Sequence, residues 1–254
     1  MTEGRDNSRG EITEDRVLGG RIVLSQPRVG YRAGLDAALL AASVQASAGE
    51  RVLEAGCGVG AALLAAAVRS PGVSFVGVER DEAARVLAAA NVAANSLGDR
   101  AVAVAGDIAL PFRNLGLTPF DVVMSNPPFF DDPGALRGPN PARRGAYLAD
   151  DGLAAWTGFL LKAAREGGRI HIIHRADRLA DILAGLAPKA GSFRIRPIQP
   201  FADAPAKRVL VQAVKTGKAP LVLLPALVLH ERGGEKHRPD VEAILHGEAF
   251  LGWD

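Results

Sequence analysis

The sequence predicts an α/β fold in which a mostly parallel sheet carries helices on both faces. From residue 51 onward, short apolar runs alternate with helical segments of about 10–15 residues, which is typical of right-handed β-α-β units. Glycines, acids or asparagine directly follow several of these runs, and ligands of such folds bind outside the carboxyl ends of the strands. The chain has 254 residues, of which 48% are hydrophobic and 23% charged, an ordinary composition for a folded chain.

The elements follow in chain order. Two short apolar runs around Gly19 and Gly20 indicate a hairpin over residues 16–25, and residues 35–44 have a helical period. Seven strands are then predicted at 51–55, 73–78, 101–105, 120–124, 169–173, 193–197 and 208–215. Helices are predicted between them at 59–68, 81–96 (with Asp81 as N-cap), 153–165 and 177–186. The expected fold is therefore a Rossmann-like, seven-stranded sheet with an N-terminal hairpin and helix extension.

The chain is expected to form one domain. We expect a flexible tail over 1–15 and a single domain over 16–254, divided into an extension at 16–48, a core at 49–216 and a C-terminal segment at 217–254. Residues 131–150 are rich in proline, glycine and arginine and are expected to form a mobile loop.

Cysteine usage and hydropathy favour a cytoplasmic protein. Cys57 is the only cysteine, so no internal disulfide can form and a reducing compartment is the simple inference. No apolar run approaches the length of a membrane span, and the polar N-terminus does not have the pattern of a signal peptide.

The net charge of +2 conceals an uneven distribution. Residues 188–238 hold ten lysines and arginines against three acids, so this stretch carries +7 and the remainder −5. Arginine supplies 24 of the 30 basic residues, and a basic face with many arginines suits a polyanion. The alternative is a solvated surface in an arginine-rich protein.

A glycine-rich loop follows the first strand of the predicted core. Its glycines, Gly56, Gly58 and Gly60, have the spacing G-x-G-x-G, whereas a dinucleotide loop requires G-x-G-x-x-G. Glu54 lies two residues before the first glycine, where a carboxylate would repel a phosphate and attract an amine or a sulfonium. The loop therefore favours S-adenosylmethionine, and the alternative is a tight turn without a ligand.

Acids follow the next two strands. Glu79, 21 residues after Gly58, can accept hydrogen bonds from both ribose hydroxyls of a nucleoside. Asp107 is placed to accept from an adenine amino group, or else it caps a turn. Cys57 has no histidine near it in sequence, so we do not expect it to be a nucleophile.

The sequence Asn126-Pro127-Pro128-Phe129-Phe130 follows the fourth strand. Two prolines fix the backbone and donate no hydrogen bonds, so the turn presents acceptors, namely the Asn126 side-chain oxygen and the Pro127 carbonyl. Two acceptors can hold both hydrogens of a planar amine and turn its lone pair toward a methyl donor. Phe129 offers a flat face to a base. The alternative is a proline turn with two core phenylalanines.

Together these motifs resemble class I S-adenosylmethionine-dependent methyltransferases that act on amino groups and carry an Asn-Pro-Pro-aromatic sequence. Residues 18–21 (LGGR), 26–27 (QP) and 30–41 (GYRAGLDAALLA) further resemble the bacterial family that methylates N6 of an adenine in the anticodon loop of valine tRNA. The resemblance covers about residues 16–230.

The resemblance implies which residues form the site. Those expected to line the cofactor site are Glu54, Gly56, Cys57, Gly58, Gly60, Glu79, Arg80, Asp107, Ile108 and Asn126, with Asp36 and the turn at Tyr31 and Arg32 closing over it. Residues 126–129 would hold the target amine. Arg137, Arg143 and Arg144, together with the basic stretch 188–238, would bind RNA phosphates.

Other functions stay open at this point. The acceptor could be another planar amine, such as a release-factor glutamine, a guanine of ribosomal RNA or a small molecule. The chain could also be a non-enzymatic module that retains the cofactor pocket, while a nicotinamide dehydrogenase is disfavoured by the glycine spacing. No His, Cys and acid cluster has metal-ligand spacing, and His171 and His174 are expected to be structural.

Overall fold

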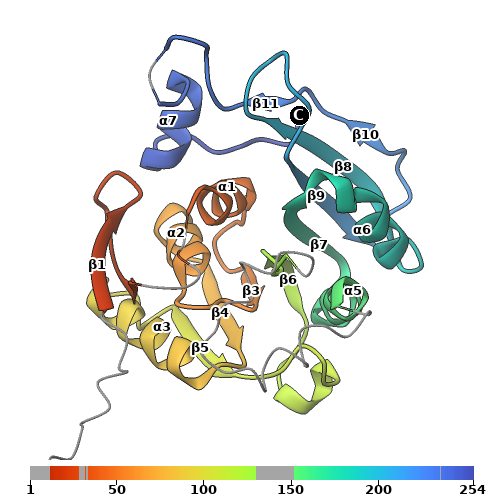
Figure 1. Cartoon of the computed structure of the whole chain (residues 1–254). Coiled ribbons are helices and arrows are strands. Elements are labelled where there is room, and N and C mark those ends of the chain that lie inside the picture. The colour runs from red at the N-terminus through yellow and green to blue at the C-terminus, as the bar shows by residue number, and fades with distance from the viewer. Residues whose placement is uncertain (1–11, 29–31, 33, 130–151, 235) are drawn as a thin grey trace, which may run out of the picture.

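The computed structural model describes residues 12–28, 32, 34–129, 152–234 and 236–254 (Figure 1). Its strands are β1 (Ile12–Val17), β2 (Ile22–Pro27), β3 (Arg51–Ala55), β4 (Ser74–Glu79), β5 (Ala101–Ala105), β6 (Phe120–Ser125), β7 (Ala164–Arg175), β8 (Ala190–Gln199), β9 (Arg208–Lys215), β10 (Val222–Leu223) and β11 (Leu227–Val228). Its helices are α1 (Leu35–Ser43), α2 (Ala61–Arg69), α3 (Glu82–Ala94), α5 (Gly152–Ala163), α6 (Leu179–Leu186) and α7 (Pro239–His246), with 3-10 turns η1 (Phe112–Leu115) and η2 (Ala176–Arg178).

The central sheet has the strand order β10-β8-β9-β7-β6-β3-β4-β5, and β11 pairs with the far part of β8. All pairings are parallel except those that β9 makes with β7 and β8. The seven predicted strands are present, and the prediction of a mostly parallel α/β sheet is confirmed. The predicted number of strands is wrong, because the sheet has nine. The two additional strands, β10 and β11, contain two residues each and are too short to show a period in the sequence.

Helices cover both faces of the sheet. Figure 1 shows α1, α2 and α3 on one face and α5 and α6 on the other. Along β3 the side chains alternate between two hydrophobic clusters: Val52 packs in the cluster that contains α1 and α2, and Leu53 in the cluster that contains α5 and α6. A parallel sheet buried on both faces explains why its strands are nearly continuous apolar runs.

The hairpin of β1 and β2 packs against α3 through two asparagine side chains. Asn91 accepts a bond from the amide of Ser25 (2.8 Å) and donates one to the carbonyl of the same residue (2.9 Å). Asn95, one turn later, makes the same pair of bonds with Val23 (2.9 and 2.7 Å). The outward backbone groups of β2 are thus satisfied by helix side chains instead of a third strand.

The hairpin also begins earlier than expected. The tail was predicted to extend to residue 15, but β1 begins at Ile12. Asp15 accepts bonds from Gln26 (2.8 Å) and Arg32 (2.6 Å), so this polar residue of the expected tail is paired within the hairpin and with the segment after it.

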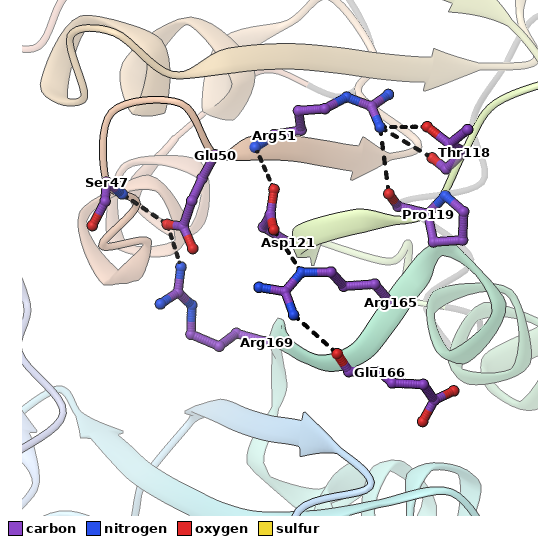
Figure 2. Close-up of polar contacts among 9 residues, drawn as sticks. All are labelled: Ser47, Glu50, Arg51, Thr118, Pro119, Asp121, Arg165, Glu166 and Arg169. Atoms are coloured by element: carbon purple, nitrogen blue, oxygen red, sulfur yellow. Dashed lines mark hydrogen bonds and ion pairs between the residues drawn. The ribbon is translucent and has the colours of Figure 1, made fainter.

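A polar network joins the amino-terminal ends of three central strands (Figure 2). Asp121 accepts bonds from the amide of Arg51 (2.8 Å) and the side chain of Arg165 (2.6 Å). Glu50 pairs with Arg169 at 2.6 Å. Burial alone would raise the pKa of Asp121, but the Arg51 amide and Arg165 together hold it below its usual value. This network lies at the edge of the sheet opposite to the edge where the strands end.

The C-terminal segment is fixed to the core by backbone acceptors. The indole nitrogen of Trp253 donates to the carbonyl of Ser43 (2.8 Å). Arg194 donates to the carbonyl of Trp253 (2.7 Å), and Arg196 to that of Gly252 (2.7 Å). Two arginines of the predicted basic stretch therefore hold the end of the chain.

Candidate active site

Most of the predicted site residues are brought to one edge of the sheet. Because β3, β4, β5 and β6 are parallel neighbours, their carboxyl ends lie side by side. In the register, Ala55 is opposite both Val78 and Ser125, so the segments after β3 and β6 are adjacent. The glycine loop, the acids after β4 and β5, and the turn at Asn126 consequently converge.

The glycine loop has the left-handed backbone that its composition suggested. Gly56, Gly58 and Gly60 have φ of 67°, 55° and 88°. A Cβ at Gly56 would lie 2.2 Å from the Trp156 ring of α5, so a side chain cannot be placed there. Among the described residues, a Cβ at Gly58 would meet nothing within 4 Å, so these residues leave the space above Gly58 open to a ligand. The left-handed Gly60 is the N-cap of α2, which starts two residues later than predicted.

Glu54 is a buried acid beneath this loop. Its side chain belongs to a residue that is only 3% exposed, and its Oε2 atom has no hydrogen-bond partner among the described residues. Burial raises the pKa of Glu54 well above its usual range, the Leu63 amide offsets part of this shift, and the charge of Glu79 adds to it. A buried carboxyl group with one unpartnered oxygen fits a positively charged group.

Cys57 packs inward. Its residue is 6% exposed, and a Cβ on Gly77 of β4 would lie 2.6 Å from the Cys57 sulfur. Burial, together with Glu54 and Glu79, raises the pKa of the Cys57 thiol well above its usual value, which disfavours the thiolate. The thiol therefore fills space below the loop, and only the loop backbone at this position could face a cofactor.

Glu79 holds the loop in place through its two carboxylate oxygens. Oε2 accepts from the amide of Gly58 (2.9 Å) and Oε1 from the amide of Asp81 (2.8 Å). Each oxygen retains a second lone pair, so the carboxylate can still accept bonds from hydroxyls. Asp81 also caps α3 as predicted, accepting from the amides of Ala83 (3.0 Å) and Ala84 (3.1 Å).

Asp107 caps a turn, which was the alternative to a contact with an adenine amino group. Its Oδ1 accepts from the amide of Ala109 (2.9 Å), and its Oδ2 lies 3.4 Å from a guanidinium nitrogen of Arg80. Ile108 is partly buried against the cluster around α5. Arg80 and Asp107 thus lie across the ends of β4 and β5, and their contact with a nucleoside stays a prediction.

The turn after β6 is tied to the end of β3. The hydroxyl of Ser125 donates to the carbonyl of Ala55 (2.9 Å), directly before the glycine loop. Asn126 is half-buried, Pro127 is buried, and Pro128 and Phe129 are partly exposed. The turn therefore lies next to the loop with a part of Asn126 accessible, while Pro127 is enclosed.

Two residues that the sequence did not single out for the site fix the ring of Phe129. The Arg208 guanidinium lies over this ring at 4.6 Å from its centroid, and the His174 ring meets it edge to face at 5.2 Å. Arg208 is also paired with Asp36 of α1 at 3.0 Å. Asp36, which was expected to close over the cofactor site, is therefore linked to the turn by way of Arg208. Burial is the main cause that lowers the pKa of His174 to about 4, and the imidazole is therefore neutral at physiological pH.

The positions of Arg208 and His174 in their strands could have assigned them to the site from the sequence. His174 lies near the end of β7 and Arg208 at the start of the antiparallel β9, so both belong to the edge of the sheet where β6 ends. His171 is also buried, as expected for a structural histidine, and burial lowers its pKa to about 3. Its ring lies 3.4 Å from the Ser43 hydroxyl.

Several predicted residues lie outside the described part of the chain. They are Tyr31, Phe130, Arg137, Arg143 and Arg144. Arg32, next to Tyr31, bonds to the hairpin through Asp15 and Thr13 (2.6 and 2.8 Å).

The structure changes the interpretation of the basic stretch. Six of its ten basic side chains already contact a carboxylate or a backbone carbonyl, namely Arg194, Arg196, Arg208, Lys215, Arg232 and Arg238. Much of the positive charge therefore stabilises the fold and is less available to a polyanion than the count suggested. In the described residues, no three His, Cys, Asp or Glu side chains gather as metal ligands. The same residues include no helix that is long and apolar enough to cross a membrane.

Comparisons with known proteins agree with this geometry. Residues 21–136, which include the loop and the turn, match the family model described as methyltransferase small domain. The chain is 31% identical over 201 residues to a tRNA1(Val) (adenine(37)-N6)-methyltransferase of Porphyromonas gingivalis, covering 75% of this chain and 77% of the relative. It is 39% identical over 82 residues to a release factor glutamine methyltransferase of Gloeobacter violaceus, covering 32% and 28%. A crystal structure of a predicted O-methyltransferase from Agrobacterium tumefaciens has a TM-score of 0.73 and 25% identity, covering 85% of this chain and 98% of the other.

Proposed function

The chain belongs to the family of tRNA1(Val) (adenine(37)-N6)-methyltransferases and is an S-adenosylmethionine-dependent methyltransferase; from this premise we propose that its methyl acceptor is N6 of an adenine in tRNA. One observation carries the proposal: the pairing of β3 with β6 places the donor-free turn at Asn126 next to the glycine loop. An acceptor amine held by the turn therefore lies beside whatever the loop binds.

The residues around the loop fit S-adenosylmethionine. The unpaired carboxylate oxygen of Glu54 would face its positive charge, and the open space above Gly58 admits a ligand close to the backbone. Glu79 would accept from the ribose hydroxyls and Asp107 from the adenine amino group. When bound, the cofactor supplies a methyl group on a positively charged sulfur.

The turn would position the acceptor. The side-chain oxygen of Asn126 and the carbonyl of Pro127 would each accept one hydrogen of the amino group, which leaves its lone pair free to point at the methyl carbon. Phe129 would contact the base with the part of its ring that Arg208 leaves exposed. After transfer the nitrogen is acidic, so its proton can leave to water and no strong base is required.

One specific observation supports a second candidate for the methyl acceptor. The glutamine of a release factor also presents a planar NH2 group, and the short similarity to a release factor glutamine methyltransferase supports this alternative. That similarity covers 32% of this chain, whereas the tRNA methyltransferase from Porphyromonas gingivalis is matched over 75%, which favours the adenine.

The test replaces Asn126. Asn126→Ala should reduce the formation of N6-methyladenosine in unmodified tRNA by about a hundredfold, because the amine is no longer held in line. Asn126→Asp, which retains an acceptor oxygen, should keep more activity than the alanine variant. Mass spectrometry of the nucleosides identifies the product. Methylated glutamine in a release-factor peptide, with unmethylated tRNA, would instead favour the second acceptor.

A further inference from the structure

A column of flat side chains lies beyond the end of β8. The Arg232 guanidinium lies over the Phe201 ring at 4.8 Å. The Phe201 and His230 rings are 5.6 Å apart and tilted by 48°, and the His230 and His237 rings are stacked at 5.1 Å with 24° between their planes. We call these four residues the Phe201 stack. Three of them, Phe201, His230 and Arg232, border a surface hollow to which Val228, Asp203 and Arg238 also contribute.

The stack is held in position from its inner end. His237 bonds to Glu242 of α7 at 2.8 Å, and the His230 ring bonds to the carbonyl of Lys236. The His230 amide donates to the carbonyl of Pro200 at 2.9 Å, which anchors the segment after β11 to the end of β8. Rings fixed in this way lose little freedom when a further flat group binds.

The charges around the hollow are balanced. Arg232 is paired with Asp203 at 3.1 Å and Arg238 with Glu231 at 2.8 Å and Asp240 at 3.3 Å. Because carboxylates already occupy both guanidinium groups, the hollow is a poor site for a phosphate. An uncharged flat group that stacks on Phe201 or Arg232 is the better fit.

The hollow lies at the same edge of the sheet as the catalytic turn. The strand β8 has the direction of β6 and β7, and β9 and β7 lie between β8 and β6. Since neighbouring strands are about 4.8 Å apart, β8 is about 14 Å from β6, a distance that a few nucleotides can span. Ile198 near the end of β8 is opposite Arg208, the residue that contacts Phe129.

We propose that the hollow at the Phe201 stack binds an unpaired nucleobase of the substrate RNA, a few nucleotides from the methylated adenine. The inference rests on the proposed function and gives the RNA a second contact, made by stacking and not by charge. A base of any sequence can stack in this way, so the contact would contribute affinity more than sequence selectivity.

The test measures RNA binding by Phe201→Leu, which keeps apolar bulk and removes the aromatic face. A fluorescent tRNA anticodon stem-loop should bind this variant about tenfold more weakly. The slope of log Kd against log salt should not change, because a lost phosphate contact would reduce it by about 0.9. Phe201→Trp should retain the affinity, and Phe250→Leu, which alters an exposed ring elsewhere, should leave it unchanged.

Cofactor affinity and thermal unfolding establish that each variant is folded. An unchanged Kd for Phe201→Leu overturns the inference, as does a reduced salt slope, which would indicate a phosphate contact. If the unaltered enzyme methylates tRNA and Phe201→Leu does so with the same KM, the inference fails while the proposed function stands. If the unaltered enzyme neither binds nor methylates tRNA, both fall.

Discussion

The buried carboxyl group of Glu54 is the side chain that we propose to favour a positively charged cofactor. Burial favours its neutral form, and the nearby charge of Glu79 acts in the same direction. A bound cation reverses this balance, because it offers the charged form a partner where the described residues leave Oε2 without one. Cofactor binding is therefore expected to involve the ionised form of Glu54.

We predict that cofactor affinity rises with pH through the raised pKa of Glu54. Glu54→Gln should weaken S-adenosylmethionine binding by about tenfold or more and remove this pH dependence. Calorimetric titration over a range of pH measures both effects. Glu82→Gln, which changes an exposed acid at the start of α3, is the matched control and should behave as the unaltered protein.

The same shift has a consequence for the cofactor-free protein. The folded pKa of Glu54 lies above the unfolded value of 4.5, so above that pH the unfolded chain releases a proton that the folded chain retains. The free energy of unfolding should consequently fall as the pH rises above 4.5, and Glu54→Gln should remove this component of the fall. A pH-independent affinity together with an unaltered stability profile would contradict the assigned role.

At the scale of elements, α3 couples the N-terminal hairpin to the glycine loop. Asn91 binds both backbone groups of Ser25 and also donates to the carbonyl of Val59 in the loop (2.9 Å). Asn95 binds Val23 in the same manner, but its other bond, at 2.8 Å, is to the carbonyl of Asn91 and not to the loop. Substitutions of the two asparagines can therefore be compared, because both contact the hairpin and Asn91 also contacts the loop.

We predict that Asn91→Ala lowers both stability and cofactor affinity, whereas Asn95→Ala loosens only the hairpin. Removing Asn91 leaves partly buried backbone groups of Ser25 and Val59 without this partner, at a cost of about 2–4 kcal/mol. Hydrogen exchange should speed up at the Ser25 amide in the first variant and at the Val23 amide in the second. Equal losses of cofactor affinity in both variants would show that the loop does not depend on Asn91.

The sequence contained enough to predict the elements whose patterns are local. The cap at Asp81 and the glycine loop follow from adjacent residues: the cap has the expected hydrogen bonds, and the loop has left-handed glycines. By contrast, the bonds of Asn91 join residues 66 positions apart, which no periodicity reveals. The excess of arginines was visible, but their partners were not, because Arg208 meets Asp36 across 172 positions. These long-range pairs give several arginines of the expected RNA surface partners within the chain.

At the scale of the whole molecule, the carboxyl and amino ends of the parallel strands form two different edges of the sheet. The carboxyl edge holds the loop and the turn, while the amino edge holds the ion-pair network around Asp121 (Figure 2). The strands between them are buried on both faces, so each edge is fixed by the same core. Changes at the amino edge should therefore affect the free energy of unfolding and leave the site geometry intact.

We predict that Asp121→Asn lowers the free energy of unfolding by about 1–3 kcal/mol, because an amide cannot accept from both the Arg51 amide and Arg165. Cofactor affinity measured by calorimetry should not change, because Asp121 lies at the start of β6 and Asn126 follows the other end of this strand. Glu166→Gln is the control at the same edge: its ion pair with Lys215 is on a side chain that is 69% exposed, so the cost should stay below about 1 kcal/mol. Urea unfolding of the three proteins gives the stabilities. If Asp121→Asn weakened cofactor binding as much as it weakened the fold, the two edges would be coupled through the sheet, and stability would not be separable from cofactor binding.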